Sequence, residues 1–425
     1  MRRYILRSIG AVALIASAHS AAAQHPSADS TLSRLLREAV AANPALAAAT
    51  ARGHAADLRV RPAGALAGPT LSVGVMDLTL PTFAFRQSDF TEIDVQAEQS
   101  FPWPGTLAAR TKSAAALGAA SRADIEVARR DLVGRVAEVY HRLRYVVTAR
   151  ATLIRQQALL EGTVQSALSQ YAAGAVPQSD PLQVRIVAAR LSADSAALAS
   201  EELVLRSRLR AMRAVRGADP IGITSLTDAD ALALLRGADS AHVGPTPDLA
   251  RQPRIAANRA FATASNESVD VARLSGKPEF MVTARYGARP LGADFFSAFV
   301  GVRLPLWSQS KQRALVQAAH ADADAAQSAV RDAEANLRSE WEALEANATA
   351  SRDQLAILVD RVLPIADAAT EASLRDYGLG KASVATVLAA EDAAFRVRLD
   401  IARITSEHLS HIVMQAQFAT WEITP

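Results

Sequence analysis

Three short stretches of the sequence contain residue types that can carry out chemistry. Residues 308–311 (Ser-Gln-Ser-Lys) have the spacing of a Ser-x-x-Lys motif, in which the serine is a nucleophile for acyl transfer. Residues 378–381 (Gly-Leu-Gly-Lys) have the glycine and lysine content of a phosphate-binding loop. His408 and His411 are three positions apart on a predicted helix, a spacing at which two imidazoles can share a metal ion.

Each stretch lacks the other residues that its chemistry requires. The Lys-Thr-Gly partner of the Ser-x-x-Lys motif is absent, and Ser308 is placed where it would cap a helix. Residues 378–381 do not follow the Gly-x-x-x-x-Gly-Lys-Ser/Thr order and are expected to form a helical-hairpin turn. No third ligand accompanies the two histidines in a patterned way, and no Ser-His-Asp set is present. The sequence therefore predicts a protein that is not an enzyme, with no catalytic residue, cofactor or metal site.

The first 23 residues predict a cleavable secretory signal. Three arginines precede a mostly apolar run over residues 9–16, and three alanines at 21–23 precede Gln24. The apolar run is too short to cross about 30 Å of hydrocarbon. We therefore expect an exported protein whose mature chain begins near Gln24.

Charge and cysteine content exclude several classes of protein. Of 46 basic and 43 acidic residues, the predicted signal removes three arginines and no acids, so the mature chain is balanced. Neither nucleic-acid binding nor adhesion to anionic lipid is indicated. Cysteine is absent, which removes disulfides, thiolate metal sites and an N-terminal lipid anchor. Half of the residues are apolar, aromatic residues are few and alanine is abundant, a composition typical of long packed helices.

Four segments have β-type composition or alternate apolar and polar residues. They cover residues 70–80, 90–101, 280–289 and 295–306, and form two pairs that we expect to be hairpins. About ten residues at a 45° tilt span a bilayer as a β-strand. Beyond the predicted signal no run of 18 apolar residues occurs, so a membrane crossing would use these strands. The alternative is a soluble sheet of two hairpins.

Each strand pair is followed by a long helical stretch, about 106–171 and about 309–377. Apolar residues spaced three and four apart predict a coiled-coil seam in each stretch, from Leu132 to Tyr171 in the first and from Leu337 to Ile365 in the second. After a breaker, each long helix is followed by a return helix, about 180–216 and about 383–418, so that each half ends in a helical hairpin. Pro364 lies in the second long helix, where a proline removes one hydrogen bond and favours a bend. We therefore expect a hinge at Pro364.

The two halves repeat one another. Tyr171 and Gly174 recur 206 positions later as Tyr377 and Gly380, so that both breakers read Tyr-x-x-Gly. The same or a similar offset relates Pro44 to Pro253, Pro69 to Pro278, Pro102 to Pro305 and Leu182 to Leu388. Agreement at this many positions indicates an internal duplication.

The duplication predicts a mostly α fold with a small β part, built from two repeats of a strand pair and a long coiled-coil hairpin. The domains are a signal at 1–23, a first repeat at 24–216, a linker or equatorial segment at 217–253 and a second repeat at 254–425. The first repeat begins with a helix at about 30–62. The linker is rich in Gly, Pro and Asp, and one short helix is expected in it.

This order of elements resembles the TolC-like outer-membrane efflux factors, the outer membrane efflux protein family, over about residues 30–418. The resemblance depends on Asn-Pro at 43–44, on Phe-Pro-Trp-Pro-Gly at 101–105, on Leu-Pro-Leu-Trp at 304–307 and on the two Tyr-x-x-Gly turns. It implies a homotrimer whose strands close a twelve-stranded β-barrel in the outer membrane of a Gram-negative bacterium. An α-helical tunnel would continue this barrel across the periplasm.

The resemblance also implies a function. Such a protein is a passive conduit, the outer-membrane channel component of a tripartite efflux system, in contact with outer-membrane lipid. Its partners are a periplasmic adaptor (membrane fusion protein) and an inner-membrane resistance-nodulation-division pump. The Phe-Pro-Trp-Pro-Gly string is similar to that of the heavy-metal cation branch, which makes metal cations the candidate substrate.

In the family, the Tyr-x-x-Gly turns lie at the periplasmic tip, where adaptor and pump engage. The resemblance thus assigns this contact to Tyr171, Ala173, Gly174, Ala175, Tyr377, Leu379, Gly380 and Lys381. The alternative is that they only form turns, with Gly in the left-handed conformation. Family tunnels often narrow at rings of carboxylates near the tip, and the nearest acids here are Asp180 and Asp376. They are candidate gate residues, and the alternative is that they are solvated acids at helix ends.

Two other functions remain open from the sequence. A soluble periplasmic coiled-coil adaptor would also contain a long helical hairpin, but adaptors usually have one hairpin between split β domains, whereas here the hairpin occurs twice. A periplasmic hydrolase would use Ser308 and Lys311.

Overall fold

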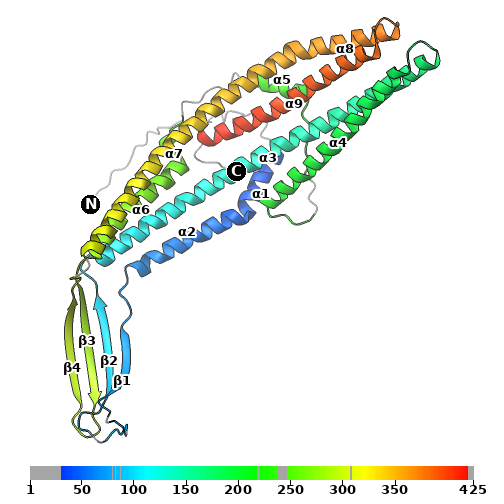
Figure 1. The fold of residues 1–425 in the computed structure, drawn as a ribbon. Helices are drawn as coiled ribbons and strands as arrows, with labels where there is room; N and C mark the ends of the chain where they lie inside the picture. Colours follow the sequence, from blue (N-terminus) through cyan, green and yellow to red (C-terminus); the bar gives the residue numbers. More distant parts are fainter. Residues whose placement is uncertain are drawn as a thin grey trace, which may run out of the picture.

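The computed structural model is elongated, with a small β-sheet at one end and long helices that run from the sheet to two turns at the other (Figure 1). The predicted signal at 1–23 and Trp307-Ser308 lie outside the described residues. The structure describes residues 30–78, 80–81, 83–86, 88–217, 221–237, 247–306 and 309–419.

The first half of the chain supplies two short helices, two strands and one long hairpin. The helix predicted at about 30–62 is divided at Asn43, because the residue before a proline avoids the α-helical conformation. Asn43 has ψ 121°, and its side chain accepts hydrogen bonds from the backbone N–H groups of Ala45 and Leu46. Its amide also donates to the carbonyl of Met212 (2.8 Å), which joins this helix start to the end of the hairpin. The elements are α1 (Ser30–Ala42), α2 (Pro44–Ala63), β1 (Thr70–Met76), β2 (Glu92–Phe101), α3 (Thr106–Ala172) and α4 (Ser179–Met212).

The second half repeats this order. A short helix, α5, lies within the predicted linker, as expected, whereas the domain boundaries themselves stay predictions. The elements are α5 (Asp228–Gly237), the 3-10 turn η1 (Leu249–Arg251), α6 (Pro253–Leu274), β3 (Glu279–Ala288), β4 (Phe295–Arg303), α7 (Gln309–Ile357), the π-helical turn η2 (Leu358–Val362), α8 (Leu363–Gly378) and α9 (Val384–Ala419). We call α3 and α4 the first hairpin, and α7, η2, α8 and α9 the second hairpin.

The four strands form one antiparallel sheet in the order β1-β2-β3-β4. The two predicted strand pairs are therefore confirmed, and β2 pairs with β3 to join the halves. β2 begins two residues later than predicted, and two other strands end at least three residues early. β1 ends before Asp77, whose φ of 54° turns the chain, and β4 ends at Arg303, because Pro305 has no N–H for a ladder. Leu304 and Leu306, predicted on the last strand, lie beyond it.

The predicted seam on α3 is buried along most of its length. Near the middle of the molecule, Leu143 packs in a cluster with Leu35 of α1 and Leu209 of α4. Farther from the sheet, Leu160 belongs to a second cluster that contains side chains of both hairpins. The prediction is wrong at the last seam position, since Tyr171 is 43% exposed.

The seam of the second hairpin shifts by one residue where the sequence predicts a hinge. Leu355 is fully buried, but the predicted seam residue Ile365 is 70% exposed, and Val359 and Ala366 are buried. The π-helical turn η2 lies between these positions and adds one residue to a helical turn. Pro364 follows directly and cannot donate to the preceding turn, which explains why the helix widens there.

Candidate functional site

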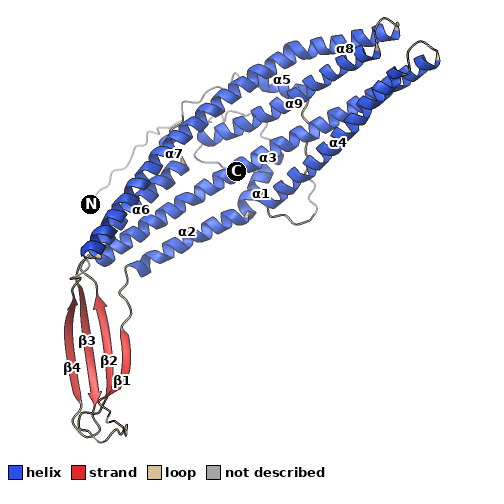
Figure 2. Ribbon diagram, in the orientation of Figure 1, coloured by secondary structure: helices blue, strands red, loops and turns tan. Residues whose placement is uncertain are grey.

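The sheet has one face made of exposed apolar side chains. Directly paired residues of an antiparallel sheet share a face, and the register aligns Val73, Val95, Tyr286 and Phe296 across all four strands. Figure 2 shows that none of the described helices covers this sheet. The face consists of Leu71, Val73, Val75, Ile93, Val95, Val282, Tyr286, Phe296, Val300 and Val302, which are all more than one-third exposed. A contiguous apolar patch of this kind marks a surface that meets lipid or another protein.

The opposite face of the same sheet carries the charged residues, together with the apolar side chains of Met281, Phe295 and Phe299. Glu92 and Asp94 of β2 and Arg285 of β3 are joined by ion pairs, and Glu279 and Arg303 form another pair near the helices. The alternation of apolar and polar residues along the strands therefore gives a two-sided sheet, with lipid-compatible and water-compatible faces. Within the described residues, none of the helices combines the length and the apolar character needed to cross a membrane.

The two Tyr-x-x-Gly turns have the same backbone geometry. Gly174 and Gly380 have φ of 72° and 71°, and their N–H groups donate to the carbonyls of Tyr171 (2.9 Å) and Tyr377 (3.0 Å). A Cβ at either glycine would meet nothing within 4 Å, so the positive φ and not a lack of space favours glycine. We call residues 171–175 the first tip and residues 377–381 the second tip.

The tips differ in how their tyrosines lie. Tyr377 is only 4% exposed, packed in the cluster shared by the two hairpins, whereas Tyr171 is 43% exposed. Burial, with a smaller contribution from Asp180, raises the pKa of the Tyr377 hydroxyl. The other predicted tip residues are exposed, namely Ala173, Gly174, Ala175, Leu379, Gly380 and Lys381. The structure therefore leaves two small exposed turns, of which only the second is anchored through its tyrosine.

The candidate gate residues are not equivalent. Asp180 lies in the first turn of α4, where the helix N-terminus favours a carboxylate, and is 9% exposed. Asp376 is exposed near the end of α8. Asp180 is close enough to Tyr377 to act on its pKa, so it belongs to the contact between the hairpins.

Sequence analysis missed a buried acid between the hairpins. Glu391 of α9 is 6% exposed, and Thr163 of α3 donates its hydroxyl to the Glu391 Oε1 atom at 3.5 Å. Burial raises the pKa of Glu391, and the Thr163 hydrogen bond opposes this only in part. Glu391 follows the core residue Val387 by four positions, which places it on the same face of the helix. This spacing is the sequence signal that could have predicted its burial.

His408 and His411, whose spacing would allow them to share a metal ion, are buried and partly buried respectively. His408 is buried, and its Nδ1 atom lies 3.0 Å from the Ser351 hydroxyl of α7. Burial lowers the pKa of His411. Over the described ranges, no three His, Asp or Glu side chains are grouped so that they could hold a metal ion. His408 thus connects α9 to α7.

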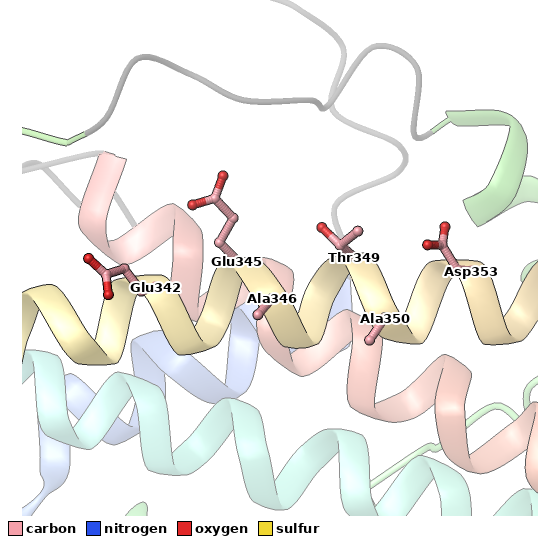
Figure 3. A pocket seen from close by; sticks show the side chains of 6 residues that line it. All are labelled: Glu342, Glu345, Ala346, Thr349, Ala350 and Asp353. Atoms are coloured by element: carbon pink, nitrogen blue, oxygen red, sulfur yellow. The ribbon is translucent and has the colours of Figure 1, made fainter.

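A hollow of about 470 Å³ lies beside α7, and the described residues that line it all belong to that helix. Figure 3 shows Glu345, Thr349 and Asp353 projecting from the same side of α7. Carboxylates that all project from one exposed face of a helix are typical of a surface in contact with water. We assign no ligand to this hollow.

Comparison with known proteins agrees with this architecture. Residues 248–411 match the sequence model of the outer membrane efflux protein family. No curated protein matches the chain. The outer-membrane channel OprN is 19% identical, covers 92% of this chain and 91% of its own, and has a TM-score of 0.77.

Two further solved structures are similar over most of their length. VceC, an outer membrane protein of Vibrio cholerae, is 19% identical with a TM-score of 0.73, over 92% of this chain and 97% of its own. CusC, whose structures describe folding and transmembrane channel formation, is 16% identical with a TM-score of 0.78, over 92% of each chain. These similarities confirm the predicted fold class.

Proposed function

We propose that this chain, which carries an outer membrane efflux protein domain and has the fold of outer-membrane channels, is the channel component of a tripartite efflux system. The observation that carries the proposal is the two-sided sheet joined directly to two long hairpins. α3 alone, with 67 residues, is about 100 Å long. One end of the molecule therefore suits a bilayer, and the other reaches deep into the periplasm.

A homotrimer completes the membrane part. β1 and β4 are the edges of the sheet, and an unpaired edge in lipid leaves backbone groups without hydrogen bonds. Three copies pair these edges and close a twelve-stranded barrel with the apolar face toward lipid and the polar face toward the lumen. The strand loops then lie outside the cell, and the helices form a tunnel in the periplasm.

The tips are then the parts that meet the partners. We propose that Tyr171, Ala173, Gly174, Ala175, Tyr377, Leu379, Gly380 and Lys381 contact a periplasmic adaptor and an inner-membrane resistance-nodulation-division pump. All of these residues except Tyr377 are exposed, which supports this proposal. The two turns share one backbone geometry, and their exposed side chains are available to a partner. Asp180 and Asp376 are the proposed gate, and Pro364 is the proposed hinge.

The proposed role is passive and requires no catalytic residue. Metal cations are the proposed substrate on the resemblance of the Phe-Pro-Trp-Pro-Gly string alone. In the structure, Trp103 of this string stacks on Phe280 at 5.9 Å between ring centroids, at the base of the sheet. This aromatic residue therefore also has a structural role.

An adaptor is less consistent with the structure. Among the described residues there are two long hairpins and one sheet with a bare apolar face, whereas an adaptor has one hairpin between split β domains.

Membrane fractionation, detergent extraction and sizing test the proposal. We expect a trimer in the outer-membrane fraction that forms channels in planar bilayers. Recovery as a soluble monomer would falsify the proposed function.

The same bilayer recordings test the gate. Asp180→Ala and Asp376→Ala should change the conductance or the cation selectivity of the channel. Unchanged values for both variants exclude a gate at these residues.

A further inference from the structure

A compact group of charges occupies the polar face of the sheet at the end far from the helices. We call Glu92, Asp94, Arg285 and Arg289 the mouth cluster. The Nε atom of Arg285 donates to Asp94 Oδ1 at 2.5 Å, and its Nη2 atom donates to Glu92. The Nε atom of Arg289 lies 3.4 Å from the second oxygen of Glu92. The cluster thus connects β2, from the first half, to the end of β3, from the second.

The mouth cluster is covered although it lies on an open sheet. The side chains of Glu92 and Asp94 are 6% and 12% exposed. The ring of Phe295 lies against both guanidinium groups, 5.5 Å from Arg285 and 4.7 Å from Arg289. Carboxylates with so little water contact require positive partners, because an unpaired buried charge is costly.

A second ion pair on the same face provides an internal comparison. Arg303 and Glu279 are 3.1 Å apart at the end of the sheet near the helices, and their side chains are 65% and 43% exposed. Solvent screens exposed pairs of this kind strongly. The mouth cluster therefore holds the less screened charges of the two groups, with two guanidinium groups facing two covered carboxylates. Asp77, an exposed acid at the end of β1, is also close enough to act on Arg285.

We propose that the mouth cluster determines charge selectivity at the outer end of the channel, and that Arg285 is the residue that neutralises Glu92 and Asp94. The proposal rests on the function proposed above, in which the polar face lines the lumen and each trimer carries three clusters. Because Glu92 and Asp94 are paired with arginines, the wild-type mouth should discriminate only weakly between cations and anions. Removing the positive charge of Arg285, or the negative charge of Glu92, from all three copies would leave a ring of unpaired charges of the other sign. Such a ring attracts ions of the opposite sign in a narrow lumen.

Four variants test the proposal in planar bilayers under a salt gradient, with potassium chloride as the probe. Arg285→Gln should raise the cation-to-anion permeability ratio at least about twofold, and Glu92→Gln should lower it by a similar factor. The double variant should return close to the wild-type ratio. Arg285→Lys keeps the charge and should also stay close to wild type, even if it pairs less well.

Arg303→Gln is the matched control, because it also removes one arginine from the polar face but at an exposed pair. Its effect on the ratio should be clearly smaller than that of Arg285→Gln. Sizing in detergent, carried out on every variant, identifies those that assemble as trimers. If Arg285→Gln does not fold, Glu92→Gln and Arg285→Lys still test the proposal.

The outcomes separate this inference from the proposed function. Shifts of the same sign in Arg285→Gln and Glu92→Gln, or no shift in either, overturn the role of the mouth cluster and leave it a structural link between strands. An equal shift in Arg303→Gln also overturns it. Absence of any channel activity in the wild type instead contradicts the proposed function itself.

Discussion

At the scale of single residues, the contact between the two hairpins contains an acid, Glu391, on which no basic side chain of the described residues acts. The pKa of Glu391 is raised by burial, and only the Thr163 hydroxyl lowers it. The nearby acids Asp367 and Asp392 are paired with arginines of α9. An uncompensated buried carboxyl favours its neutral form.

This arrangement predicts a pH-dependent contact between α3 and α9. Because the pKa of Glu391 is raised in the packed state, the contact is strongest below the ordinary glutamate pKa and weakens as pH rises through the raised value. Single-channel conductance of the wild type should therefore increase with pH over this window. Glu391→Gln should remove this pH dependence and keep the low-pH conductance.

The exposed Glu161 of α3 provides the control, since Glu161→Gln removes an acid from the same region without touching the interface. It should keep the wild-type pH dependence. A Glu391→Gln channel with an unchanged pH profile would show that Glu391 does not govern the contact.

At the scale of elements, the two hairpins have the same turn but different long helices. α3 is continuous over 67 residues, whereas the second hairpin is interrupted by η2 and then Pro364. π-helical turns and prolines are common sites of helix bending. Movement on opening should therefore be concentrated in the second hairpin.

Pro364→Ala tests this difference. The variant restores an N–H donor and should allow η2 to return to α-helix, which makes the second hairpin stiffer. Pairs of spin labels at the two tips, measured with and without the proposed adaptor and pump, should show a larger shift for the second tip in the wild type. That difference should decrease in Pro364→Ala. Equal movement of both tips in the wild type would contradict the hinge.

At the scale of the whole molecule, the two faces of the sheet determine the proposed orientation of the protein in a membrane. Val300 is 78% exposed on the apolar face, and Thr283 of the neighbouring strand lies on the polar face. Val300→Arg should reduce the amount of assembled trimer in the outer membrane, because an arginine at the middle of the lipid face costs about 2–4 kcal/mol.

Thr283→Arg is the matched control for the face assignment. It adds the same side chain on the lumen side, where water can solvate it, and should leave assembly close to wild type. Heat-stable trimer in membrane extracts provides the measurement. Equal loss of trimer in both variants, or normal assembly of Val300→Arg, would contradict the proposed orientation of the sheet.

Much of the fold was determined by local patterns in the sequence. Apolar spacing specified the strands and the seam of α3, and the Tyr-x-x-Gly repeat specified both turns, because Gly174 and Gly380 need only a positive φ. The sequence predicts one continuous helix through Asn43-Pro44, whereas the structure ends α1 and begins α2 there. These features depend on residues close together in the chain, where periodicity and turn chemistry are informative.

Only the tertiary structure decided which side chains meet across elements. Glu391 and Thr163 are 228 positions apart, and Arg285 is 191 positions from Asp94. Two tyrosines in identical turns differ in burial because one of them packs into the cluster shared by the hairpins. Periodicity identifies the buried face of a helix or strand but not its partner, since burial is a property of the packed pair. The sequence alone therefore determined the elements and their duplication, and packing decided the contacts that distinguish one copy from the other.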